Sequence, residues 1–113
     1  MKKLEEWFKR GGVYPIYYRL IERTDKTALY KLFIKEEWMD DYEHVGWEVS
    51  RILLYEAGER FGKMYPETEK IPTDDMFGET LESDKAFFPK DEKRAHDYFL
   101  EFDKKLHQLK EVV

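Results

Sequence analysis

The residues best suited to chemistry are three histidines, each of which follows an acidic residue by four positions. The three pairs are Asp40 with His44, Glu92 with His96, and Asp103 with His107. On a helix this spacing places both side chains on the same face, where a carboxylate can orient an imidazole or join it as a metal ligand. Ordinary surface pairs also explain the spacing, because they stabilise helices by themselves.

A metal site would draw on His96, Asp103 and His107, which share one side of the last expected helix. A metal needs a further ligand that converges from another segment, and no second Glu-x-x-His pattern is present. The chain has no cysteine, which excludes thiolate zinc sites and thiol catalysis. It also lacks a glycine-rich phosphate loop and a nucleophile elbow. We therefore expect no enzymatic activity, no cofactor and no metal, and retain this site only as an alternative.

Glu56 and Arg60 form a candidate polar pair, four residues apart within the apolar arc of the helix expected over residues 40–64. Charges in such a position are partly buried, which is costly unless they are paired and hydrogen-bonded. One interpretation is a small polar pocket or a contact between subunits. The other, which we favour, is an ion pair at the edge of the core, in which the aliphatic parts of both side chains are buried and the charged groups are exposed to solvent.

A candidate binding surface lies on residues 13–23 and 27–35, two runs rich in β-branched and aromatic residues that predict a β-hairpin. The period of two in a strand separates two faces. The apolar face, expected in the core, holds Ile16, Tyr18, Leu20, Tyr30, Leu32 and Ile34. The opposite face mixes cations with aromatic rings, and its binding candidates are Tyr17, Arg19, Lys31, Phe33 and Lys35.

The same mixed face also fits a binder of single-stranded nucleic acid, in which cations attract phosphates while aromatic rings stack on bases. The basic residues Lys2, Lys3, Lys9 and Arg10 add positive charge before the hairpin. Against this stands the sequence pI of about 5.3, well below the value above 9 expected of a nucleic-acid-binding domain. Nucleic acid therefore remains the alternative partner.

Acidic residues dominate the middle of the chain. Residues 1–35 contain nine Lys or Arg and four acids, residues 36–84 contain four and fifteen, and residues 85–113 contain seven and six. The acidic candidates for binding a basic partner are Asp40, Asp41, Asp74, Asp75 and Glu79. A solvated acidic loop explains the same composition, and so does neutralisation of the basic N-terminal part within the fold or across a dimer.

The stretch over residues 40–64 has the signals expected of a central helix. Asp40 can cap the first turn and Glu43 can reach back as in a capping box, while Gly62 and Pro66 mark the end. At about 100° per residue one wide apolar arc forms. It comprises Val45, Val49, Ile52, Leu53, Ala57, Phe61 and Met64. So wide an apolar surface requires cover on more than one side.

Three further segments flank this helix. Residues 2–10 place Leu4, Trp7 and Phe8 at helical spacing, and two glycines follow. Residues 65–89 form a long loop rich in breakers, in which KAFF at 85–88 is the best candidate for an extra strand. Residues 90 to about 111 predict a last helix, with a proline at its start and lysines near its end. Its apolar stripe, expected along the central helix, comprises Ala95, Phe99, Phe102, Leu106, Leu109 and Val113.

These elements predict an α+β fold in a single domain of residues 1–113. In it, two long helices pack on a small antiparallel sheet, which consists of the hairpin and a possible third strand, and a short helix precedes the sheet. We expect no membrane span, because no apolar run approaches the required length of about 20 residues. The sequence contains no cysteine and begins without the apolar core of a signal peptide, and both features favour a cytoplasmic location.

The function expected from these features is a small non-catalytic protein-interaction module that forms a homodimer. Its mixed hairpin face would mediate self-association, and its acidic segment would bind an unidentified protein partner. The chain contains no Asn and a single Gln, a scarcity of heat-labile side chains that fits a thermophilic source. An accessory or inhibitory protein of a virus or mobile element matches this size and this lack of reactive groups.

Overall fold

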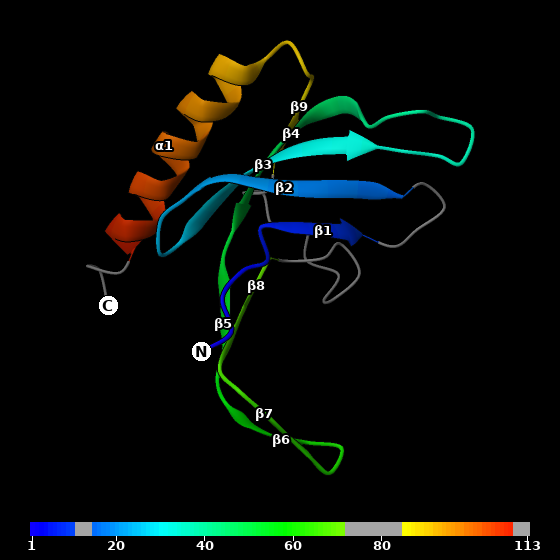
Figure 1. Ribbon diagram of the computed structural model, residues 1–113. Helices are drawn as coiled ribbons and strands as arrows, with labels where there is room; N and C mark the ends of the chain where they lie inside the picture. Colours follow the sequence, from blue (N-terminus) through cyan, green and yellow to red (C-terminus); the bar gives the residue numbers. More distant parts are fainter. Residues whose placement is uncertain (11–14, 72–84, 110–113) are drawn as a thin grey trace.

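An antiparallel sheet of five strands, crossed on one face by a single helix, forms the body of the protein (Figure 1). The computed structural model describes residues 1–10, 15–71 and 85–109. The strands, in their order across the sheet, are β1 (Trp7–Arg10), β2 (Ile16–Arg23), β3 (Thr27–Ile34), β4 (Glu43–Arg51) and β9 (Lys85–Phe87). The helix, α1, spans Glu92–Leu109.

The predicted central helix over residues 40–64 is wrong, since these residues form strands. Strand β4 lies between β3 and β9 and has side chains packed on both of its faces. Val45, Trp47 and Val49 alternate with Gly46, Glu48 and Ser50, which is the period of a strand, but Val45, Val49, Ile52 and Leu53 also fit helical spacing, so periodicity alone did not decide between the two. The β-branched residues Val45, Val49 and Ile52 were the local signal for a strand.

The predicted fold class is wrong for the same reason: the protein is mostly β, and residues 1–10, 15–71 and 85–109 contain one helix in place of two long helices and a short one. Residues 2–10 also lack the expected helix, because Trp7–Arg10 is strand β1 and pairs antiparallel with β2. Leu4 and Phe8 nevertheless pack on the core, as expected of apolar residues in this segment.

The hairpin prediction is confirmed. Strands β2 and β3 pair antiparallel around a three-residue connection at 24–26, with Ile16 opposite Ile34, Tyr18 opposite Leu32 and Leu20 opposite Tyr30. A β-bulge at Ile21 takes up one extra residue near the turn. The two predicted sets of side chains therefore do lie on opposite faces of the sheet.

Two later elements also follow the prediction. The KAFF segment contributes β9, which pairs with β4, and α1 falls within the predicted range of residues 90–111. Of the helix stripe, Ala95, Phe99 and Phe102 are buried, but they pack on the sheet and not on a second helix. Their partners on the sheet include Leu29 and Val49.

The sheet is buried on both faces by separate apolar clusters. The face under α1 holds Leu29, Trp47, Val49, Ala95, Phe99 and Phe102. The opposite face holds Tyr18, Ala28, Tyr30, Leu32 and Ile71, against which Leu4 and Phe8 pack. The predicted apolar face of the hairpin is thus part of the core, as expected, but the core lies on the side away from the helix.

A long hairpin, here called the β-arm, leaves the sheet after β4 and extends away from it (Figure 1). In it β5 (Leu53–Tyr55) pairs with β8 (Thr68–Lys70), and β6 (Gly58–Arg60) pairs with β7 (Lys63–Tyr65). Phe61 and Gly62 form its two-residue turn, with φ angles of 51° and 77°. Positive φ at both central residues is the geometry that matches the twist of a hairpin.

Candidate interaction surface

Helix α1 covers only part of its face of the sheet, and the uncovered part carries a group of aromatic rings. This aromatic patch consists of Trp7, Tyr17, Phe33, Tyr42 and His44, contributed by β1, β2, β3, β4 and the loop before β4. Cross-strand pairing aligns its members, since Tyr17 lies opposite Phe33 on β3 and Phe33 lies opposite His44 on β4. The register of the sheet therefore creates the patch.

The rings pack closely on one another around Trp7. Its indole stacks on Tyr17 with centroids 5.6 Å apart and meets the edge of Tyr42 at 5.3 Å. The ring centroid of Phe33 lies 5.8 Å from that of the indole. Trp7 is nevertheless 43% exposed and Tyr42 is 42% exposed. Large rings that are half exposed in one cluster are typical of binding surfaces.

Cations border the patch on the strands. The Lys9 amino group lies 5.9 Å from the centroid of Tyr17, and that of Lys31 lies 5.7 Å from Phe33 and 5.4 Å from Trp47. Exposed Arg19 lies on the same face, paired with Trp7 on β1 and Lys31 on β3. Cations over ring faces are favourable and also present positive charge to a ligand.

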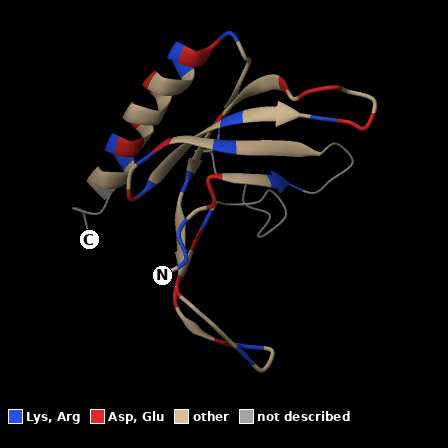
Figure 2. Cartoon of the chain, viewed as in Figure 1, with Lys and Arg blue, Asp and Glu red and all other residues tan. Residues whose placement is uncertain are grey.

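Carboxylates border the patch on its other side, in the loop between β3 and β4. Glu36, Glu37, Asp40 and Asp41 lie in this loop at the same end of the sheet as the basic ends of β1 and β3 (Figure 2). A hollow of about 480 Å³ is lined by Lys9 and Lys35 as well as by Glu36 and Glu37, with Tyr17 and Tyr42 between them. Charges of both signs therefore line one hollow beside the aromatic rings.

Most of the predicted binding residues meet at this surface. Tyr17, Arg19, Lys31 and Phe33 share the face, and Lys35 follows β3 directly and donates from Nζ to the Met39 carbonyl at 3.1 Å. Exposed Asp40 and Asp41 lie beside them in the loop. The other predicted acidic residues, Asp74, Asp75 and Glu79, lie outside the described residues.

The predicted polar pair of Glu56 and Arg60 does not occupy the edge of a core. Both side chains are exposed on the β-arm. The Arg60 guanidinium lies 5.6 Å from the ring centroid of Tyr55. The expectation of a partly buried ion pair was wrong because it depended on the central helix, whose period would have turned both residues inward.

The structure gives His44 and His96 other partners than the sequence predicted, and gives His107 a second one. His96 Nε2 lies 3.0 Å from Glu22 on β2, and His44 Nε2 lies 2.9 Å from the Gly46 carbonyl. His107 does lie beside Asp103, but its Nε2 contacts Asp25 in the hairpin turn at 2.8 Å. Within residues 1–10, 15–71 and 85–109, no three His, Cys, Asp or Glu side chains are grouped to hold a metal.

Trp7, Tyr42 and His44 are the three patch residues that the sequence analysis did not assign to a binding surface. Trp7 was placed in a short helix, and Tyr42 and His44 fell in the first turns of the predicted central helix, after its cap Asp40. A signal was present in Trp7 and Phe8, two β-prone aromatic residues shortly before a glycine pair and a further β-prone run, a pattern that also predicts a hairpin.

Comparison of the chain with family models, with curated proteins and with solved structures found no match. In the part of the chain that the structure describes, no helix is both long and apolar enough to cross a membrane. Functional inference therefore depends on the surface itself.

Proposed function

We propose that the protein is a non-catalytic interaction module that forms a homodimer through the aromatic patch. The observation that supports this proposal is the joint presence, on one open face, of half-exposed rings, a basic side and an acidic side. In a twofold dimer the same surface is used by both copies, so a surface must complement itself. In the proposed dimer, the strand cations of each copy lie over the acidic loop of the other.

Most of the binding energy of the proposed dimer should come from the aromatic rings. Aromatic residues at the centre of an interface supply most of its binding energy, while charges at its rim contribute chiefly to orientation and to the association rate. Trp7 and Tyr42 are the exposed members of the patch. Trp38, at the tip of the acidic loop and 79% exposed, would extend the buried area.

Sedimentation tests the dimer. The chain should sediment with a mass near twice 13.8 kDa, and Trp7→Ser should shift it toward the monomer. The matched control is Phe88→Ser, which removes another exposed ring, 71% exposed, next to β9. A monomer whose mass does not change with protein concentration contradicts the proposal.

Charge exchange tests the orientation. One variant, Lys9→Glu with Arg19→Glu, makes the basic side acidic, and the other, Glu37→Lys with Asp40→Lys, makes the acidic side basic. Each variant alone should be monomeric because like charges then meet across the interface. A mixture of the two should form heterodimers. Failure of the mixture to associate, while each variant remains folded, refutes this arrangement.

A second candidate function is binding of single-stranded nucleic acid by the same surface. The observation in its favour is the position of Lys9 and Lys31 directly over aromatic rings. This candidate predicts that affinity for a labelled oligonucleotide falls steeply with salt and drops on Lys31→Glu. The acidic loop beside the patch opposes it, because that loop repels a phosphate backbone.

A further inference from the structure

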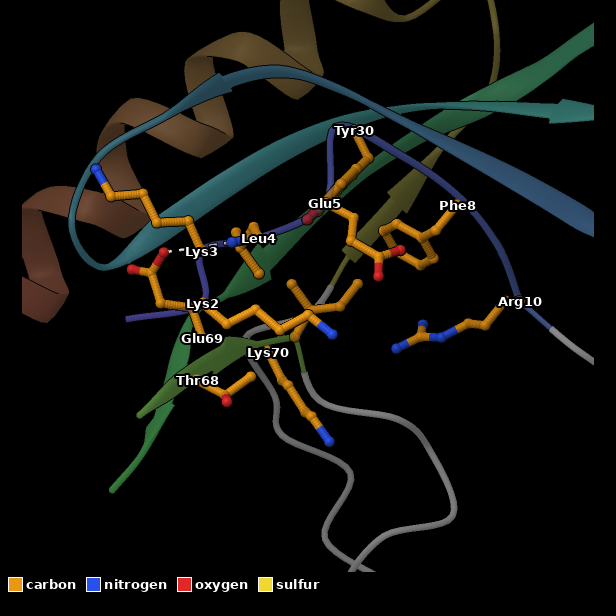
Figure 3. Close-up of a pocket in the computed structure, with 11 residues that line it drawn as sticks. Lys2, Lys3, Leu4, Glu5, Phe8, Arg10, Tyr30, Thr68, Glu69 and Lys70 are labelled. Carbon is orange, nitrogen blue, oxygen red and sulfur yellow. Dashed lines mark hydrogen bonds between the residues drawn. The ribbon is translucent and has the colours of Figure 1, made fainter. Parts of the chain in front are cut away.

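A separate hollow opens on the other face of the sheet, between the N-terminal segment and the base of the β-arm (Figure 3). Its volume is about 230 Å³. A dry cavity of about 150 Å³ is known to accept benzene, so this hollow is large enough for a somewhat larger ring or a branched chain. Its walls include the apolar side chains of Leu4, Phe8 and Ile71.

The wall of this hollow contains a buried hydroxyl without a partner. Tyr30 has no exposed surface, and its hydroxyl makes no hydrogen bond with any described residue. Figure 3 shows the Tyr30 side chain directed from the sheet toward Leu4 and Glu5 at the hollow. A buried hydroxyl without a partner is costly, and native proteins satisfy nearly all such groups. Burial also raises the pKa of Tyr30, so this group is a neutral donor at physiological pH.

Lys2 and Lys70 supply positive charge at the rim of the hollow. The other charged residues that line it are Lys3, Arg10, Glu5 and Glu69. Arg10 is already engaged, since it donates to the Tyr18 hydroxyl and lies 3.9 Å from the Glu48 carboxylate. Glu69 is already neutralised by Arg23, whose two terminal nitrogens each lie 2.7 Å from one of its oxygens. In Figure 3, Lys2, Lys70 and Arg10 direct their charged ends toward the open side, while Lys3 points away.

From these three features we infer that the hollow binds a small organic acid with an apolar, ring-sized body. The body packs against Leu4, Phe8 and Ile71. One oxygen of the ligand's carboxylate accepts the hydrogen bond that Tyr30 can donate, and the other oxygen faces Lys2 and Lys70 at the rim. Ligand sites commonly combine an apolar lining with a few convergent polar groups in this way. The site lies on the face opposite the aromatic patch and is independent of the proposed dimer.

The probe for this inference is 3-phenylpropanoate, with the uncharged 3-phenylpropanamide and with acetate as comparison ligands. Amide chemical shifts of the labelled protein are followed during titration. The acid should bind saturably, with perturbations at residues 2–10 and 68–71, and the amide should bind several-fold more weakly because it lacks the charge. Acetate, which lacks the apolar body, should produce no saturable shift.

Two variants test the assigned contacts. Tyr30→Phe should weaken binding of 3-phenylpropanoate by about 2- to 10-fold, the equivalent of one hydrogen bond. Lys2→Gln combined with Lys70→Gln should weaken it by a similar factor. Their matched controls lie outside both the hollow and the aromatic patch: Tyr65→Phe, and Lys93→Gln combined with Lys104→Gln, change exposed residues and should leave the affinity unchanged.

The outcomes separate cleanly. Absence of saturable binding at millimolar 3-phenylpropanoate overturns the inference. So does binding that Tyr30→Phe and the lysine variant leave unaltered, or perturbation centred on Trp7 and Tyr42. Leu4→Phe, which fills the hollow while its spectrum elsewhere stays native, should abolish binding, and undiminished binding by this variant likewise contradicts the site.

Discussion

Tyr18 on β2 and Tyr30 on β3 are buried neighbours with ring centroids 5.5 Å apart, but their hydroxyls have different surroundings. Arg10 donates from Nη1 to the Tyr18 hydroxyl at 3.2 Å, whereas the Tyr30 hydroxyl has no partner among the described residues. Burial, with a smaller contribution from Glu48, raises the pKa of Tyr18 to about 12. Both groups therefore remain neutral in ordinary buffers.

Removing the Tyr18 hydroxyl and removing the Tyr30 hydroxyl should affect the free energy of unfolding differently. Tyr18→Phe loses a hydrogen bond to a charged group and should lower the free energy of unfolding by about 1–2 kcal/mol. Tyr30→Phe removes a buried group that has no partner, and should leave stability unchanged or higher. Urea denaturation of the ligand-free protein measures both. A loss on Tyr30→Phe as large as that on Tyr18→Phe would show that the Tyr30 hydroxyl is bonded.

His107 provides a pH-dependent contact between α1 and the hairpin turn. The backbone carbonyl of Asp103 raises the pKa of His107, assisted by the Asp25 carboxylate, and His107 in turn lowers the pKa of Asp25. Protonated His107 therefore favours the folded state at pH below its ordinary pKa of 6.5, and this contribution is lost as pH rises through its folded pKa. The Asp25 contribution is lost as pH falls below 3.8, its ordinary value, through its folded pKa.

The contact should accordingly be strongest between pH 3.8 and 6.5. His107→Gln should lower the melting temperature at about pH 5.5 and have little effect at about pH 8. The matched control is Gln108→Ala, an exposed change in the same helical turn, which should be insensitive to pH over this range. An equal effect of His107→Gln at both pH values contradicts the assignment.

At the scale of elements, α1 is held on the sheet mainly by its apolar stripe. Phe99 is 1% exposed within the cluster around Trp47 and Val49, while the adjacent Leu100 is 51% exposed. Polar contacts fix the two ends of the helix: Trp47 Nε1 donates to the Pro89 carbonyl at 3.1 Å, and the Thr27 hydroxyl donates to Asp103 at 2.8 Å. Packing thus sets the strength of the contact and hydrogen bonds set its position.

Phe99→Ala should lower the free energy of unfolding by about 3–5 kcal/mol, because it leaves a cavity between helix and sheet. Leu100→Ala, the neighbouring change on the outer face, should cost less than about 1 kcal/mol. Equilibrium denaturation compares the two. Similar losses at both positions would mean that α1 does not pack on the sheet through this stripe.

The β-arm provides a second test at this scale. Its two glycines, Gly58 and Gly62, both have free space for a side chain, but their backbone geometry differs. A Cβ placed on either Gly58 or Gly62 meets nothing within 4 Å, but Gly62 has a φ of 77°. Gly62→Ala should therefore destabilise the arm by about 1–2 kcal/mol through the left-handed backbone alone. Gly58→Ala should be nearly neutral. Hydrogen exchange of amides in β6 and β7 measures both, and equal protection would refute the turn geometry.

At the scale of the molecule, the β-arm makes the shape extended. The radius of gyration is 15.4 Å, whereas a globular chain of this length has about 13 Å. The base of the arm is held by the Arg23–Glu69 ion pair and by hydrogen bonds of Lys2 to Glu67 and Glu69. This ion pair lowers the pKa of Glu69, whose side chain is only 9% exposed.

Arg23→Ala should detach the base of the arm, because it leaves the nearly buried Glu69 carboxylate unpaired. The expected loss in the free energy of unfolding is about 1–3 kcal/mol, with faster amide exchange in β5, β8 and residues 2–4. Arg60→Ala, near the exposed tip of the same arm, is the matched control and should cost little. Equal effects of the two changes would show that the ion pair does not anchor the arm.

Local sequence was sufficient where a segment's own pattern identifies its secondary structure. The faces of β2 and β3, the extra strand at KAFF and the helix over residues 92–109 follow from alternation, flanking breakers and helical spacing. The mixed face of Tyr17, Arg19, Lys31 and Phe33 was predicted on the same basis. It required only that the strands pair in register.

Tertiary structure decided the rest. Residues 43–51 become strand β4 because β3 and β9 supply hydrogen-bonding partners on both of its edges, and this pairing decides between the strand period of Val45, Trp47 and Val49 and the helical spacing that the same stretch also allows. The aromatic patch and the hollow beside Tyr30 each assemble side chains far apart in the chain. The local sequence pattern determined which residues alternate between the two faces of a strand. Which strand edges pair, and therefore which surfaces exist, was decided only when the whole sheet formed.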